Sequence, residues 1–78
     1  MDIRDERFHV TQFFADDAGY ERVAEAVDLA KAMEIATHYC TSVTARIGIT
    51  TRVIITDMGD SIVFEWIYKK GVVFPNEH

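Results

Sequence analysis

Two pairs of acidic residues are the first candidates for chemistry, because neighbouring carboxylates can hold a cation or transfer a proton. Asp57 and Asp60 stand on either side of a glycine, and Asp16 and Asp17 precede Gly19. Neither pair matches a calcium-binding loop, which needs several alternating oxygen ligands and a closing glutamate. Acids beside glycine are typical of tight turns instead. We therefore expect two hairpin tips and no metal site, unless both tips lie side by side and bring the four acids together.

The histidines and the single cysteine form no pattern that is typical of catalysis. His38 and Cys40 fall two residues apart in a predicted helix, about 200° apart around its axis, so they cannot share a metal or act as a nucleophile and its base. Cys40 is expected to be a small core residue. The sequence contains no glycine-rich phosphate loop, Gly-x-Ser-x-Gly elbow or Cys-x-x-Cys pair. It therefore predicts no catalytic residues and no cofactor, and it disfavours an enzyme.

Composition places the chain among small globular proteins. Its 78 residues, 49% of them hydrophobic, are enough for one domain over 1–78 and too apolar for a disordered chain. With 13 acidic against 8 basic residues, the net charge of −5 disfavours binding to nucleic acids and to anionic membranes. One cysteine without an intrachain mate, a charged N-terminus and the lack of a long apolar run predict a cytoplasmic protein outside the membrane.

The first elements that would position these residues are strands. Residues 8–15, FHVTQFFA, are rich in aromatic and β-branched side chains and predict a strand, and turn residues follow at 16–19. Residues 20–27 are ambiguous. Their alanines and glutamates favour a helix, whereas the preceding turn and the following Asp28 favour the return strand of a hairpin. We expect a strand, with a helix as the alternative.

A long amphipathic helix is expected after Asp28, whose carboxylate can accept hydrogen bonds from the first free backbone amides. The helix is predicted from Leu29 to Ile47, about five turns, with Gly48 as its left-handed C-terminal residue. Ile35 and Tyr39 lie outside the expected buried face. That face comprises Leu29, Met33, Ala36, Cys40, Val43, Thr44 and Ile47 at helical spacing.

Residues 52–66, RVIITDMGDSIVFEW, predict two strands joined by a turn. Pairing Thr56 with Ser61 sets apolar residues opposite one another and sets Arg52 opposite Glu65 as an ion pair. A one-residue slip breaks this ion pair but places the glycine of the turn where a left-handed residue is needed, so the register stays open. The pairs in the first register are Ile55–Ile62, Ile54–Val63, Val53–Phe64 and Arg52–Glu65.

The elements combine into an α+β fold. Lys69, Lys70 and Gly71 predict a further turn, and residues 72–74 a short terminal strand. We expect an antiparallel sheet of three to five strands with one long amphipathic helix across one face. The order is β-β-α-β-β, or β-α-β-β if residues 20–27 are helical.

This fold carries more apolar surface than one helix can cover. We expect a second copy to cover the reverse face of the sheet or an exposed stripe on the helix, with the chain's own N-terminal segment as the alternative cover. The candidate interface residues are Ile35, Tyr39, Arg46, Ile54, Val63 and Ile67.

The sequence thus predicts a small acidic protein-interaction or regulatory module that forms a homo-oligomer. Another protein is a further expected partner, whereas nucleic acids and membranes are not. The alternative is a small-ligand-binding protein or enzyme whose site is composed between subunits, drawing on Asp57, Asp60, His38 or Tyr39.

Overall fold

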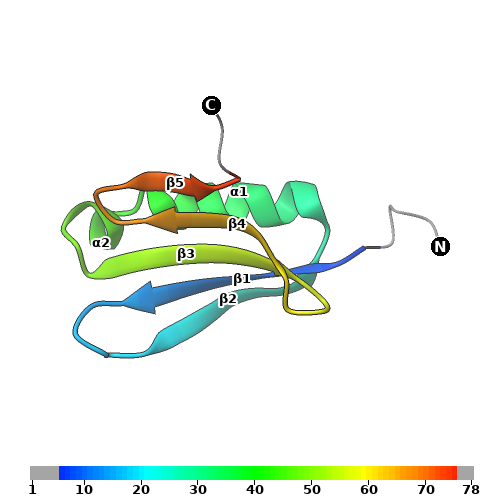
Figure 1. Cartoon of the computed structure of the whole chain (residues 1–78), viewed down its shortest axis with the longest axis horizontal. Coiled ribbons are helices and arrows are strands. Elements are labelled where there is room, and N and C mark those ends of the chain that lie inside the picture. Colours follow the sequence, from blue (N-terminus) through cyan, green and yellow to red (C-terminus); the bar gives the residue numbers. More distant parts are fainter. Residues whose placement is uncertain (1–5, 76–78) are drawn as a thin grey trace.

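A computed structural model describes residues 6–75 of the chain as one antiparallel sheet with helices behind it (Figure 1). The elements are β1 (Phe8–Phe14), β2 (Tyr20–Val27), α1 (Leu29–Cys40), α2 (Val43–Arg46), β3 (Thr50–Asp57), β4 (Ile62–Ile67) and β5 (Gly71–Phe74). Across the sheet the strands are ordered β2-β1-β3-β4-β5. The predicted α+β fold and its β-β-α-β-β order are therefore confirmed, with five strands in the sheet.

Residues 20–27 form strand β2, so the helical alternative for this segment is wrong. Val23 and Val27 pack against the core from β2, and these tertiary contacts outweigh the helix propensity of the neighbouring glutamates and alanines. The ladder between β1 and β2 is irregular, and Ala26 adopts a φ of 54°. The N–H of Ala26 donates to Nδ1 of His9 (3.1 Å), so the imidazole supplies an acceptor at this irregularity.

α1 begins where the sequence predicts. Oδ1 of Asp28 accepts a hydrogen bond from the N–H of Lys31 (2.7 Å), and the first helical residue is Leu29. The capping role predicted for Asp28 is confirmed.

α1 ends at Cys40, however, and does not continue to Ile47 as predicted. The hydroxyl of Thr41 donates to the carbonyl of Thr37 (2.9 Å), and Oγ of Ser42 accepts a backbone N–H from the first turn of α2 (3.2 Å). Serine and threonine hydroxyls offer the backbone partners outside the regular helical ladder. Two such residues in succession divide the expected helix into α1 and the short α2.

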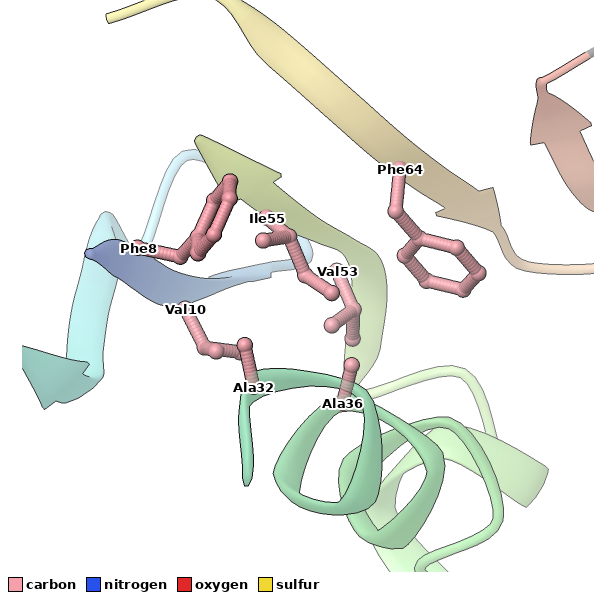
Figure 2. Packing of buried hydrophobic residues seen from close by; sticks show 7 residues of the cluster. All are labelled: Phe8, Val10, Ala32, Ala36, Val53, Ile55 and Phe64. Atoms are coloured by element: carbon pink, nitrogen blue, oxygen red, sulfur yellow. The ribbon is translucent and has the colours of Figure 1, made fainter. Parts of the chain in front are cut away.

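The buried face of α1 also differs from the predicted one. Ala32 and Ala36 face the sheet and are fully buried (Figure 2). Ile35 and Tyr39 are half-buried and pack against the core, so placing them outside the buried face was wrong. The prediction gave most weight to large side chains, whereas small ones let a helix lie close to a sheet. Five residues of the predicted face are exposed: Leu29, Met33, Val43, Thr44 and Ile47.

The core lies between α1 and the central strands β1, β3 and β4 (Figure 2). Its centre is fully dry, because Val10, Val53 and Ile55 have no exposed surface. The core cluster comprises Phe8, Val10, Ala32, Ala36, Val53, Ile55 and Phe64.

The predicted β3–β4 hairpin is present, but both registers considered for it are wrong. Val53 pairs with Trp66 and Ile55 pairs with Phe64, which shifts β4 by two residues from the first predicted register. A shift of two residues keeps the side chains of residues 64–67 on their predicted faces. An irregularity next to Ile55 leaves Val63 without a partner in β3, and Val63 packs against the core instead.

Candidate functional site

The turn between β3 and β4 uses its acids as turn residues. Oδ1 of Asp57 accepts hydrogen bonds from the N–H of Gly59 (2.9 Å) and the N–H of Ser61 (3.0 Å). Asp60 takes the left-handed conformation, with a φ of 66°, in place of the glycine. A carboxylate that binds the amides of its own turn is a structural acid.

The two acidic pairs lie at opposite ends of the sheet. β1 and β3 run antiparallel, so Phe8 lies opposite Asp57, whereas Phe14 lies opposite Thr50. The turn that carries Asp16 follows Phe14 and is therefore remote from Asp57 (Figure 1). The four acids do not form one site. Within residues 6–75, no group of three or more His, Cys, Asp or Glu side chains is placed to hold a metal ion.

His38 and Cys40 lie at the C-terminal end of α1. His38 is exposed and meets the ring of Tyr39 edge-on, with 5.0 Å between ring centroids. Cys40 is half-buried, and burial raises the pKa of its thiol to about 11. Because the thiolate is the reactive form, Cys40 is a weak nucleophile at neutral pH. Asp57 lies at the other end of the sheet, so one chain does not bring it together with His38.

The six predicted interface residues fall in three environments. Whether they contact a partner stays a prediction, but one chain does not gather them on one surface. Ile54 and Ile67 lie on the sheet surface opposite α1, Ile35, Tyr39 and Val63 pack against the core, and Arg46 is exposed on α2.

We call the sheet surface opposite α1 the open face, because no helix among residues 6–75 covers it (Figure 1). Residues paired across adjacent antiparallel strands point to the same side of the sheet. The pairing therefore defines two rows of four residues that cross the open face from β2 to β4, beside a shorter row of His9, Thr56 and Ile62. The two rows of four are Tyr20–Phe13–Arg52–Ile67 and Arg22–Thr11–Ile54–Glu65.

Arg52 connects these two rows. Its Nε donates to Oε2 of Glu65 (2.6 Å), so the predicted ion pair is confirmed although the two residues are diagonal neighbours. The guanidinium carbon lies 4.9 Å from the ring centroid of Phe13, which in turn lies 5.7 Å from that of Tyr20. Thus Arg52 is held between an aromatic ring and a carboxylate.

Sequence reasoning missed a chain of polar side chains beneath the helices. The hydroxyl of buried Thr50 donates to Oε1 of buried Gln12 (3.0 Å) and lies 2.9 Å from the hydroxyl of Thr44. Nε2 of Gln12 donates to Oε1 of Glu21 (2.8 Å), and Ser42 joins through Thr44 (3.1 Å). These bonds tie α2 to β3, β1 and β2. In the described part of the chain, every buried side-chain nitrogen and oxygen has a partner, so this network is structural.

Two polar residues at core-facing positions were the signal for this network. Gln12 pairs with Val53, whose side chain is in the core, and Thr50 follows directly after the Gly48–Ile49 turn. A buried polar side chain needs a hydrogen-bond partner.

No protein-family model, no curated protein and no solved structure matches this chain. Between residues 6 and 75 no helix is both long enough and apolar enough to cross a membrane. What the chain does must therefore be inferred from its own surfaces.

Proposed function

We propose that this chain is a small protein-interaction module that associates with a second copy through the open face of its sheet. The supporting observation is an apolar strip on a surface that no helix of residues 6–75 covers. Phe13 and Ile67, both half-buried, form the strip with Tyr20, 68% exposed, at its margin, whereas Ile54 on the same face is only 8% exposed. Removing apolar surface from water is the main favourable contribution to association.

The charges on the open face suit a twofold pair. A twofold axis near the ion pair would bring Arg52 of each copy to Glu65 of the other, because each contact in such an interface occurs twice. Both side chains are already held in place within one chain. Association through them would therefore need little further ordering of side chains.

The stripe of Ile35, Tyr39 and Arg46 on the helices is the weaker candidate for this contact. Ile35 and Tyr39 are half-buried and pack against the core of their own chain, whereas the open face also has Tyr20, which is 68% exposed. Only Arg46 of the three is exposed.

Sedimentation equilibrium at micromolar concentration tests the proposal. The wild-type chain is expected to show an average mass above the 8.9 kDa of one copy. Replacing Ile67→Lys places a charge in the apolar strip and is expected to lower that average mass. Met58→Lys is the matched control, because Met58 is exposed at the tip of the β3–β4 hairpin, and its mass is expected to equal that of the wild type.

Circular dichroism would establish that both variants keep the fold. A wild-type mass of 8.9 kDa at every concentration would contradict the proposal. So would equal masses for folded Ile67→Lys and Met58→Lys.

A further inference from the structure

A second apolar surface lies at the end of the sheet where α2 leads into β3. Ala45 is the buried residue of α2, whereas Val43 and Ile47, one turn apart, are 71% and 62% exposed. Ile49, two residues further, is 48% exposed. We call Val43, Ile47 and Ile49 the end patch. Three large β-branched side chains with this exposure, so close together in the chain, are unusual for a surface that meets only water.

Two charged hairpin turns flank the end patch. The N–H of Ala15 donates to the carbonyl of Ile49 (2.9 Å), so the turn with Asp16 and Asp17 lies beside the patch on the β1 side. The other turn follows β4, and Tyr68 at its start donates its N–H to the carbonyl of Thr51 (2.9 Å).

This second turn carries Lys69 and Lys70. The aromatic ring of Tyr68 lies against Gly48, which places the turn beside the end patch on the β4 side. Figure 1 shows α2 and both turns at one end of the molecule. The two turns are three strand spacings apart, about 14 Å. We call Asp16 and Asp17 the acidic tip, and Lys69 and Lys70 the basic tip; all four residues are exposed.

We propose that this end of the molecule binds the same end of a second copy. A twofold axis through the end patch would set the acidic tip of each copy against the basic tip of the other, with the apolar residues buried between them. This end carries acidic residues on one side, basic residues on the other and the end patch between them, with Arg46 also exposed on α2, and such an order of charges is complementary to itself. A partner of different sequence would have to present this same order of charges in reverse. The end patch is separate from the open face, so this contact does not depend on the proposed function.

Chemical cross-linking at the end patch tests the proposal, in chains that carry Cys40→Ala so that one thiol remains. A cysteine near a twofold axis lies close to the same cysteine of the second copy. Ile47→Cys is therefore expected to give a covalent dimer with a short bismaleimide. Met58→Cys is the matched control, because Met58 is equally accessible but lies at the opposite end of the sheet. It is expected to give a dimer yield several-fold lower.

Charge reversal of the tips, in the Ile47→Cys chain, makes the test specific. The first variant, with Asp16→Lys and Asp17→Lys, has two basic tips on each chain. The second variant, with Lys69→Glu and Lys70→Glu, has two acidic tips on each chain. Each variant alone is expected to lose most of the cross-linked dimer through like-charge repulsion. An equimolar mixture is expected to restore it as a heterodimer, because every contact then joins opposite charges. Mass spectrometry would identify the mixed dimer.

The acidic tip needs a second variant, since Asp16 and Asp17 have φ values of 57° and 60°, where lysine is strained. Asp16→Asn with Asp17→Asn suits this backbone and removes the charge, and it is expected to lower the dimer yield. Equal yields for Ile47→Cys and Met58→Cys would overturn the proposal. A mixture of the two reversed variants that cross-links no better than either alone would overturn it as well, and would indicate a partner other than a second copy.

Discussion

Gly48 is the residue at which one added methyl group is expected to cost most. Its φ is +85°, which confirms the predicted left-handed conformation, and a Cβ there would lie 3.0 Å from Cε2 and Cζ of Tyr68. Gly48→Ala therefore combines backbone strain with overpacking and is expected to lower the free energy of unfolding by roughly 2–4 kcal/mol.

Gly19→Ala is the control for the backbone contribution. Gly19 has a φ of +99°, but a Cβ there would meet no atom within 4 Å. The expected loss is only the strain, roughly 1–2 kcal/mol. Urea denaturation of both variants measures the difference, and equal losses would show that the Tyr68 ring moves aside freely.

Cys40 is expected to react slowly while the protein is folded. Burial raises the pKa of its thiol to about 11, so iodoacetamide at neutral pH should modify the native chain far more slowly than the urea-unfolded chain. Rapid modification of the native chain would contradict the burial of this thiol.

The same thiol predicts how stability depends on pH. The pKa of Cys40 is higher in the folded state than the ordinary value of 9.0. Below pH 9 both states keep the proton, and between pH 9 and about 11 only the unfolded state loses it. The free energy of unfolding should therefore fall over this range, and it should fall less in Cys40→Ala. Urea denaturation at several pH values measures both.

Single residues were predictable where their role depends on chain neighbours. Asp28 caps the helix that follows it, and Arg52 and Glu65 form an ion pair across one hairpin. The burial of Ile35 and Tyr39 was not predictable in this way. It depends on how the sheet meets the helix, and the small side chains that set this approach carry little weight in a hydrophobic pattern.

At the scale of elements, the β3–β4 hairpin depends on the carboxylate of Asp57. Asp57→Ala removes the acceptor for the amides of Gly59 and Ser61 and is expected to lower the free energy of unfolding by about 1–2 kcal/mol. Asp57→Asn keeps one side-chain oxygen and is expected to lose less than half as much. Urea denaturation measures both values. Equal losses in the two variants would show that the negative charge matters more than the acceptor.

The same turn explains why the register of the hairpin was not predictable. Apolar pairing allows any shift by two residues, because such a shift leaves the faces unchanged. The turn decides among these registers, and it does so through Asp57 binding its own turn and Asp60 in the left-handed conformation. The end of α1 at Cys40 was predictable from the sequence, because Thr41 and Ser42 compete for the helical hydrogen bonds.

At the scale of the molecule, two surfaces are proposed to bind a second copy. The open face belongs to strands that the sequence identified, whereas the end patch lies between turns that are far apart in the sequence. The acidic and basic tips become neighbours of the patch only when the strand order β2-β1-β3-β4-β5 is known. A surface of this kind is a property of the topology, and no local pattern in the sequence predicts it.

Two twofold contacts on one chain have a consequence for its assembly. Copies that join alternately through open faces and through ends can grow beyond a dimer. The end contact joins charged tips that are exposed, so salt screens their attraction, whereas the ion pair of the open-face contact is partly buried and is screened less. We therefore expect the average mass to rise with protein concentration at low ionic strength. In about 1 M salt, where the screening length is near 3 Å, it should level off at twice the mass of one chain. Sedimentation equilibrium at both ionic strengths measures this difference. The control is the variant with Asp16→Asn and Asp17→Asn, whose average mass should level off at twice the mass of one chain without added salt. An average mass that is the same at low and high salt would show that opposite charges at the ends do not hold copies together.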